Sequence, residues 1–446
     1  MQEFTKSETI KLGLMLFALF FGAGNMIFPP VLGQAAGTSV WTAMLGFVIT
    51  GVGLPLLGVV AVGLTGGKLQ SLASRVHPVY GIVFTWIVYL AIGPFLGIPR
   101  TGTVAFEMGL LPFLPQGESD SGLPLFLYTL AYFAVTFWLC LNPSKLVDRI
   151  GKVLTPALLL IIAIVFVQAI LNPVGGMGQP AEAYEAHPFI KGFLEGYLTL
   201  DALSALVFGI VVTSAIEERG ITERRKLTWT TVKAGMIAVA GLGLVYLALG
   251  YLGATSVSLG ASENGGQILT SLVQHLFGPV GLLLLGAAVT LACLTTSVGL
   301  VTASSRYFSE QMPKVSYKTV AAVLCLFSAA VANVGLTQLI AVSVPVLVAI
   351  YPLGIVLILL SFLHGIFKGY RTVYVAASIC TAAVSLVDGA KMLGLPVEGL
   401  TSLYQNLPLY AEGIGWLVPA VVGALAGYIW AVLRREAYPA HKKALP

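Results

Sequence analysis

The sequence predicts an all-α integral membrane protein. Hydrophobic residues make up 57% of its 446 residues and charged residues only 10%, whereas an ordinary soluble domain is about 25% charged. The apolar residues gather into segments of membrane length. Two of these segments are interrupted by glycine and polar residues, a pattern typical of membrane proteins that bind a solute near the bilayer midplane.

Segment length divides the chain into about twelve predicted transmembrane helices. A hydrocarbon core of about 30 Å requires roughly 20 helical residues. The third segment is longer than this and contains Pro94 and Pro99, so we expect it to be tilted or kinked. The predicted spans are 11–31, 40–64, 79–112, 123–141, 151–171, 192–215, 228–253, 278–304, 318–334, 338–362, 372–391 and 413–433.

The basic residues predict how these spans are oriented. With the N-terminus in the cytoplasm, the 24 Lys and Arg residues lie on or beside cytoplasmic segments, except for Arg100, Lys191, Lys233 and Lys391. This asymmetry follows the positive-inside rule. Both termini are therefore predicted to be cytoplasmic, and the net charge of +5 is an orientation signal and not a nucleic-acid footprint. On the outer side, 266–277 is interpreted either as a short helix over the mouth or as an ordinary loop.

The first predicted span is interrupted by the sequence Gly-Ala-Gly-Asn at 22–25 and closed by Pro29 and Pro30. Backbone groups released from a helix at this depth find no water. Such a break persists only where protein or a water-filled cavity satisfies those groups, and in transporters it often marks the substrate site. We therefore predict a transporter that holds a solute near 22–25.

The sixth predicted span supplies a second interruption, with Thr199, Asp201 and Ser204 in an apolar run. Because each half has five spans, the odd number inverts the second repeat. We predict a 5+5 inverted repeat with discontinuous first and sixth helices and two added C-terminal helices. Within one polytopic domain of residues 1–446, the repeats are about 8–172 and about 188–363, and the accessory helices are about 370–434.

Asp201 is the most informative single residue, because a carboxylate at the bilayer centre costs about 2.5–3.5 kcal/mol to insert. It is interpreted as the partner of a substrate ammonium, a sodium ion or a proton. The alternative is a structural ion pair with Arg100. Arg100 and Glu107 lie seven residues apart, on one face of the third helix. They either form a gate or bind a carboxylate, or they pair helices structurally, and their roles stay open.

Three consecutive hydroxyls, Thr295, Thr296 and Ser297, lie in the eighth predicted span. Hydroxyl oxygens are hard ligands that suit an alkali cation, but Ser and Thr also bond their own helix or join helices. No cluster of nucleophile, base or metal ligands is visible, since the five His residues are scattered. No filter motif is repeated. An enzyme or a channel is therefore disfavoured, and no cofactor is predicted.

The run from Gly13 to Pro30, GLMLFALFFGAGNMIFPP, resembles the signature of bacterial branched-chain amino acid carriers, the system II leucine/isoleucine/valine:cation symporters. The run from Ile92 to Thr101, IGPFLGIPRT, and Leu294 to Ser297 are also similar to that family. The resemblance covers essentially the whole chain. It implies a LeuT-type fold and uptake of leucine, isoleucine and valine driven by a Na+ or H+ gradient. A symporter of another neutral amino acid or of a nucleobase is the alternative.

The resemblance also implies roles for individual residues. Backbone N–H groups around Gly22, Ala23 and Gly24 would hold the substrate carboxylate at a half-helix N-terminus. Carbonyls of Phe20 and Leu198, with Asp201, would receive the ammonium. The remaining implied ligands are Leu203 for the apolar side chain; Ala18, Phe21, Ala292, Thr295 and Thr296 for sodium, with Ser297 as a substitute for one hydroxyl; and Asn25 and Thr199 for a second cation.

One departure from the LeuT-type pattern concerns the coupling ion. Asp201 falls where the aligned amino acid transporters carry a hydroxyl, so a carboxylate there either replaces the second sodium or carries the proton. The resemblance implies alternating access, with the first, second, sixth and seventh helices rocking against the rest. The expected setting is a bacterial cytoplasmic membrane. The expected partners are the lipid bilayer and a branched-chain L-amino acid, with neither nucleic acid nor an obligate protein partner.

Overall fold

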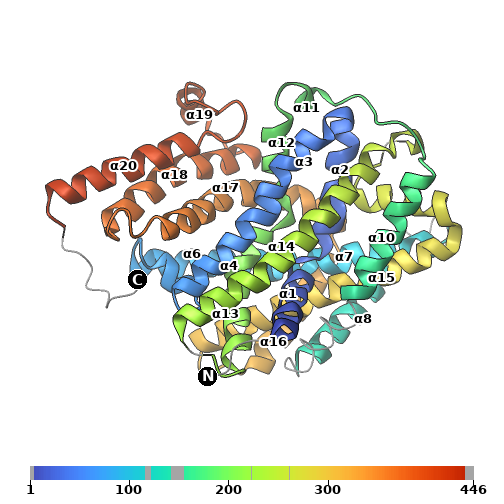
Figure 1. Ribbon diagram of the computed structural model, residues 1–446, viewed down its shortest axis with the longest axis horizontal. Helices are drawn as coiled ribbons and strands as arrows, with labels where there is room; N and C mark the ends of the chain where they lie inside the picture. Colours follow the sequence, from blue (N-terminus) through green and yellow to red (C-terminus); the bar gives the residue numbers. More distant parts are fainter. Residues whose placement is uncertain (1–4, 116–121, 142–154, 222, 261, 437–446) are drawn as a thin grey trace.

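The computed structural model describes residues 5–115, 122–141, 155–221, 223–260 and 262–436. Over these residues the chain consists of helices and their connections, without a strand (Figure 1). The predicted all-α class is confirmed. Residues 151–154 of the fifth predicted span lie outside the described residues, as do the predicted cytoplasmic residues Lys145, Arg149, Lys152, Lys442 and Lys443.

The first part of the chain supplies the helices that correspond to the first five predicted spans. They are α1 (Lys6–Phe20), α2 (Ala23–Ala36), η1 (Gly37–Ser39), α3 (Val40–Val48), η2 (Ile49–Gly53), α4 (Leu54–Leu64), α5 (Leu69–Ala73), α6 (Pro78–Leu90), η3 (Ala91–Phe95), α7 (Gly97–Gly109), η4 (Leu111–Phe113), α8 (Leu123–Cys140) and α10 (Thr155–Leu171).

The second part supplies those that correspond to the remaining spans. They are α11 (Glu182–Ala186), α12 (Pro188–Glu195), η7 (Gly196–Thr199), α13 (Asp201–Glu217), α14 (Arg224–Ala254), η8 (Val257–Leu259), α15 (Gly265–Gln311), α16 (Tyr317–Ala332), α17 (Leu336–Phe362), α18 (Arg371–Met392), α19 (Glu398–Tyr404) and α20 (Leu417–Leu433).

Every predicted span therefore coincides with helix in the described residues. Among the described residues, seven helices are long and apolar enough to cross a membrane, or eight when the bent pair 188–199 and 201–217 is taken as one span. That number treats 23–64 as one helix and leaves out three shorter apolar helices, in α10, α16 and α20. The total of twelve crossings stays a prediction.

Two of the long spans bend where the sequence contains glycine and proline. Between α6 and α7, the π-helical turn η3 holds Pro94, which has no N–H, and Gly93, whose φ/ψ is not helical. The expected kink of the third span is confirmed. Within α15, Gly278 takes φ +63° just before Pro279. The stretch 266–277 is thus a helix, and it leads directly into the eighth span.

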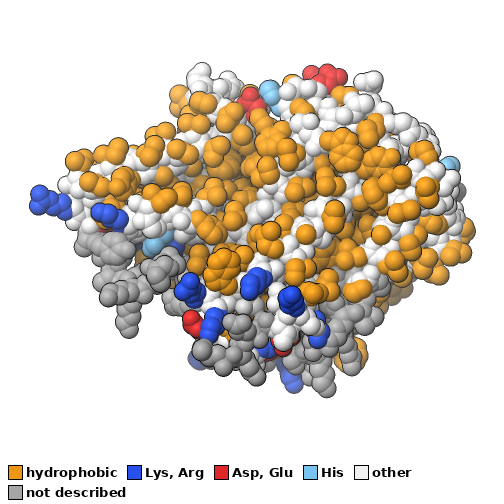
Figure 2. All heavy atoms as spheres, in the orientation of Figure 1, with side chains coloured by type: hydrophobic (Ala, Val, Ile, Leu, Met, Phe, Trp, Pro, Cys, Tyr) orange, Lys and Arg blue, Asp and Glu red, His pale blue; other side chains and the backbone are white. Residues whose placement is uncertain are grey.

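The molecule presents a broad hydrophobic surface, with Lys and Arg side chains mainly along its lower and left edges (Figure 2). Large apolar side chains such as Trp138, Leu244 and Leu425 are more than half exposed, as expected for side chains in contact with lipid tails. Helices α17, α18 and α20 pack together at one side (Figure 1). The two broken helices lie within the rest of the bundle.

Glycines allow α2, the second half of the first span, to approach its neighbours closely. A Cβ added at Gly33 would lie 1.9 Å from the Gly250 carbonyl oxygen, and one at Gly253 would lie 2.0 Å from that of Pro30. Small residues at helix contacts are the usual means of close packing in membranes. Gly265 brings the start of α15 equally close to Ile27. Helix α2 is therefore held between α14 and α15.

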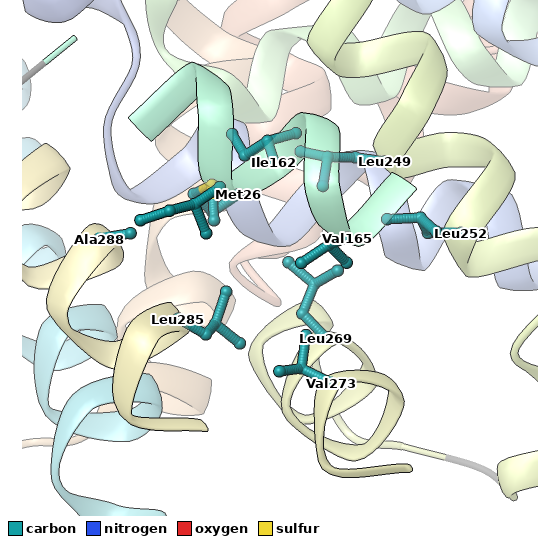
Figure 3. A pocket seen from close by; sticks show the side chains of 10 residues that line it. Met26, Ile162, Val165, Leu249, Leu252, Leu269, Val273, Leu285 and Ala288 are labelled. Atoms are coloured by element: carbon teal, nitrogen blue, oxygen red, sulfur yellow. The ribbon is translucent and has the colours of Figure 1, made fainter. Parts of the chain in front are cut away.

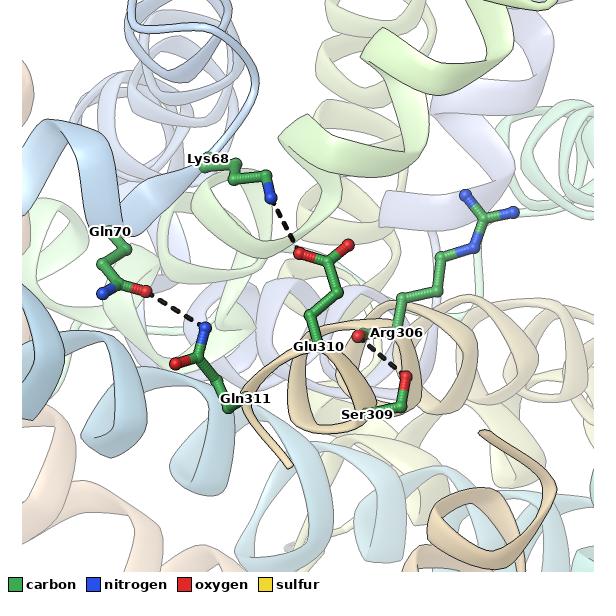
Figure 4. A network of polar contacts seen from close by, with 6 residues as sticks. All are labelled: Lys68, Gln70, Arg306, Ser309, Glu310 and Gln311. Carbon is green, nitrogen blue, oxygen red and sulfur yellow. Dashed lines mark hydrogen bonds and ion pairs between the residues drawn. The ribbon is translucent and has the colours of Figure 1, made fainter. Parts of the chain in front are cut away.

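Polar contacts tie α15 to other helices at both ends. Near its C-terminus, Lys68 Nζ lies 2.7 Å from Glu310 Oε2, and Gln311 Nε2 donates to Gln70 Oε1 at 3.4 Å (Figure 4). Near its start, Asn264 Nδ2 donates to Glu107 Oε1 at 2.6 Å. The Lys68–Glu310 pair is about half exposed, so it contributes only about 0–1 kcal/mol.

The close approach of α2 and α14 predicts an asymmetry between two glycines of α14. Gly253→Ala is expected to lower the melting temperature of the detergent-solubilised protein, because overpacking against backbone costs about 1–3 kcal/mol. Gly243→Ala is the matched control, since a Cβ there meets nothing within 4 Å. The melting temperatures of both variants are measured by heating samples and monitoring the folded fraction by size-exclusion chromatography. Equal melting temperatures for the two variants would contradict this packing.

Candidate functional site

The first helix break lies at Phe21 and Gly22. Helix α1 ends at Phe20, and the Phe21 N–H donates to the Phe17 carbonyl at 2.7 Å. Helix α2 begins at Ala23, where the N–H groups of its first turn have no acceptor within the helix. The side chain of Asn25 turns back so that its Oδ1 accepts the Gly22 N–H at 3.0 Å. The break is thus a turn held by the Asn25 side chain and followed by the N-terminus of α2.

The second break lies at Leu200, between η7 and α13. Leu200 has φ +70°, a left-handed conformation that costs a residue with a side chain about 1–2 kcal/mol. Partners from the site support it. Thr199 Oγ1 donates to the Gly196 carbonyl at 2.9 Å and accepts the Asp201 N–H at 3.4 Å. The Ala202 N–H donates to Tyr351 Oη at 3.1 Å.

Asp201 connects the two breaks. Its Oδ2 accepts hydrogen bonds from Asn25 Nδ2 and from Tyr246 Oη, both at 2.6 Å. Asn25 and Tyr246 also bond each other. All three residues are buried, with Asp201 only 2% exposed. A buried carboxylate requires such donors, and these come from α2 and α14, so one side chain joins three helices.

Arg100 reaches the same region from α7. Its Nη1 donates to the Leu198 carbonyl at 2.8 Å and its Nη2 to the Thr199 carbonyl at 3.2 Å. Its Nε has no hydrogen-bond partner among the described residues. The guanidinium lies 5.3 Å from the centre of the Phe28 ring. Arg100 and Asp201 form no ion pair. The alternative interpretation of Asp201, a structural ion pair with Arg100, is therefore not seen in the structure.

The hydroxyls of α15 meet the C-terminal end of α1. Thr295 Oγ1 lies 3.2 Å from the Ala18 carbonyl oxygen and 2.8 Å from that of Ala292. Thr296 Oγ1 lies 3.4 Å from the Ala18 oxygen and 3.2 Å from the Leu19 oxygen. A Cβ at Gly22 would lie 2.6 Å from Thr296 Oγ1. These oxygens form an all-oxygen cluster beside the first break.

Most of the residues predicted for the site come together. Gly22, Asn25, Thr199 and Asp201 meet at the two breaks, with Ala23 and Gly24 in the first turn of α2. Other predicted site residues make contacts that differ from those predicted. Leu203 points toward α17, next to Gly354. The Leu198 carbonyl is bonded to Arg100. The Leu19 carbonyl, and not that of Phe21, bonds the α15 hydroxyls, and Ser297 Oγ has no partner among the described residues.

Two apolar crevices lie beside the first span and not within the breaks. One, about 10 Å³, is bounded by α2, α10, α14 and α15, with Met26, Val165, Leu252 and Leu285 among its lining side chains (Figure 3). All the lining residues are apolar, so nothing there could hold the charged ends of an amino acid. The polar site is the one built from the helix ends.

Sequence reasoning missed two tyrosines of this site and left Arg100 open. Tyr246 and Tyr351 lie in the seventh and tenth predicted spans, far along the chain from either break. A tyrosine hydroxyl in the middle of an apolar span needs a hydrogen-bond partner. This feature of the sequence indicates that Tyr246 and Tyr351 have partners, but it does not identify the partner residues.

The apolar helices and the two joined breaks define the chain as a multi-pass membrane protein with a LeuT-type fold. The solved structure of Mhp1, a nucleobase-cation-symport-1 family transporter, is similar over 98% of this chain and 94% of its own, with a TM-score of 0.61 and 13% identity. MhsT in complex with L-phenylalanine is similar over 97% and 99%, with a TM-score of 0.56 and 16% identity. At this identity the likeness concerns the fold alone.

Residues 5–434 match the family described as branched-chain amino acid transport protein, and the chain belongs to that family. It is 53% identical over 424 residues to the branched-chain amino acid permease BraB of Bacillus subtilis (strain 168), which is 95% of each chain. It is 45% identical over 424 residues to the branched-chain amino acid permease BrnQ of Escherichia coli (strain K12), again 95% of each. The chain is a transporter and not an enzyme.

Proposed function

We propose that this protein imports leucine, isoleucine and valine across the bacterial cytoplasmic membrane by symport with Na+. The observation that carries the proposal is the buried bond between Asn25 and Asp201, which joins the two helix breaks. It is supported by relatives at 41–53% identity that are named as branched-chain amino acid permeases or carriers.

The helix ends match the charges of an amino acid. The first N–H groups of α2, at Ala23 and Gly24, lie at the positive end of a helix dipole and suit the carboxylate. Asp201 is the anionic partner for the ammonium, together with the carbonyl of Phe20. The surrounding apolar side chains would accept an aliphatic chain but separate homologues by only about 1–3 kcal/mol per methylene, so all three substrates should enter.

The oxygen cluster of Ala18, Leu19, Thr295 and Thr296 supports Na+ as the coupling ion. Its oxygen ligands would be carbonyls at the negative end of α1 and two hydroxyls. Hard oxygen ligands suit a hard cation. The predicted cluster is kept, with Leu19 in place of Phe21. A proton carried by Asp201 is the alternative that the experiment below excludes or establishes.

Alternating access would move α1, α2, α13 and α14 with the second span against the remaining helices. The contact of Glu310 in α15 with Lys68, which directly follows the second span, joins the two groups and would have to open during transport. The contact of Asn264 with Glu107 of α7 lies within the group of remaining helices. The Lys and Arg side chains, which lie mainly along the lower and left edges of the hydrophobic surface (Figure 2), support cytoplasmic termini.

Uptake of radiolabelled leucine into proteoliposomes is expected under an inward Na+ gradient, with unlabelled isoleucine and valine competing. A proton gradient without Na+ should give no accumulation. Accumulation driven by protons alone would replace Na+ with H+ in the proposal. The absence of leucine flux under either gradient would contradict the proposed function.

Asp201→Asn is expected to reduce coupled leucine uptake at least tenfold while expression stays intact, because a hydrogen bond to a charged group contributes about 1.5–3 kcal/mol. Asp388→Asn, at the outer end of α18, is the matched control and should transport like the unmodified protein. Initial uptake rates at equal protein density measure the effect. Near-normal transport by Asp201→Asn would assign Asp201 a structural role only.

Thr296→Ala is expected to raise the Na+ concentration for half-maximal uptake several-fold, because it removes one oxygen of the proposed ion site. Ser297→Ala provides the adjacent control, since its hydroxyl bonds no described residue. For both variants, the Na+ concentration for half-maximal uptake is determined from leucine uptake rates measured at a series of Na+ concentrations. An unchanged Na+ dependence in Thr296→Ala would place the ion elsewhere.

A further inference from the structure

We propose that the Arg100 guanidinium is a built-in cation of the substrate site, which takes the place of a second sodium ion. Each amino acid is then carried with a single cation from solution. This inference rests on the proposed function and concerns its stoichiometry. It starts from the second cation site that the sequence predicts at Asn25 and Thr199, and from what the structure contains there.

The guanidinium occupies the negative end of a broken helix. Leu198 and Thr199 supply the carbonyls at the C-terminal end of η7, and Arg100 donates to both, at 2.8 and 3.2 Å. The partial negative charge of a helix C-terminus favours a cation. A Cβ added at Gly24 would lie 2.7 Å from Arg100 Nη2 and 3.0 Å from the Thr199 carbonyl oxygen. The guanidinium therefore fills the space between the two breaks.

The other predicted oxygen ligands of a second cation are already used. Asn25 Oδ1 accepts the Gly22 N–H, and its Nδ2 faces Asp201. Thr199 Oγ1 donates to the Gly196 carbonyl and accepts the Asp201 N–H. A metal ion needs free lone pairs from several oxygens. The groups that would supply them instead support the two turns.

Charge balance leads to the same conclusion. Arg100 and Asp201, a basic and an acidic side chain, are each 2% exposed and form no ion pair with each other. A zwitterionic amino acid adds no net charge between them. A second sodium ion would leave an uncompensated positive charge in a site sealed from water, which low-dielectric surroundings strongly disfavour. The Na+ beside Thr295 and Thr296 is separate, because it is held by α1 and α15.

The number of charges moved per leucine tests this directly on the unmodified, full-length protein in proteoliposomes. With equal Na+ on both sides, a tenfold leucine gradient should be balanced by a membrane potential of about 60 mV if one charge moves with each leucine, and about 30 mV if two do. The expected value is about 60 mV. A value near 30 mV overturns the inference, whereas a complete lack of leucine flux refutes the proposed function on which it rests.

Variants of Arg100 distinguish a built-in cation from a purely structural cap. Arg100→Gln is expected to raise the leucine concentration for half-maximal uptake at least tenfold and to move the balancing potential toward 30 mV, because a solution cation then replaces the fixed charge. Arg100→Lys keeps the charge and should stay near 60 mV. Arg75→Gln, which removes a guanidinium bonded to Tyr374 outside the site, is the control and should not change the potential.

An Arg100→Gln protein that transports at about 60 mV with unchanged leucine affinity would overturn the inference. Size-exclusion chromatography of each variant establishes that it is folded. If Arg100→Gln does not fold, the potential measured on the unmodified protein decides the question alone.

Discussion

Backbone polar groups released from a helix at membrane depth must find partners inside the protein, and this constraint organises the whole site. Two breaks create four helix ends, and each end has its own partner. Thr295 and Thr296 meet the carbonyls of α1, and Arg100 meets those of η7. Asn25 caps the turn before α2, and Tyr351 accepts an N–H at the start of α13. These polar side chains satisfy the helix ends, while Asp201 and Tyr246 bond side chains of the site.

The same arrangement makes the site suitable for a zwitterion. The acidic side chain of Asp201 and the basic side chain of Arg100 lie beside helix ends of both signs, the first turn of α2 and the carbonyl end of η7. Asn25 and Tyr246 hold Asp201 from two other helices of the proposed moving group. Arg100 of α7, which belongs to the remaining helices, bonds the carbonyls at the end of η7. The site therefore lies across the boundary between the two proposed groups.

Much of the fold could be predicted from the sequence, because membrane length and hydropathy determine where helices lie. The span predicted at 40–64 has the boundaries of α3 to α4, and the kink near Pro94 follows from its missing N–H. The breaks were visible as glycine and polar residues in apolar runs. The helical stretch 266–277 was left open between two interpretations, since a short amphipathic run has no length criterion to decide it.

The partners within the site were harder to predict. Periodicity places Arg100 on a face of its helix but does not say which carbonyls it reaches. The resemblance implies Leu203 as a contact for the apolar side chain of the substrate, and in the structure Leu203 lies beside Gly354 of α17. Pairings between residues hundreds of positions apart depend on helix packing, which a single sequence does not encode in any local pattern.

A structure of the protein with leucine bound, determined by electron cryo-microscopy, tests the central claim most directly. We expect the ammonium of leucine within hydrogen-bonding distance of Asp201 and its carboxylate at the first turn of α2. Leucine bound elsewhere, for example in the apolar crevice beside Met26, with the Asn25–Asp201 bond unchanged, would contradict the account.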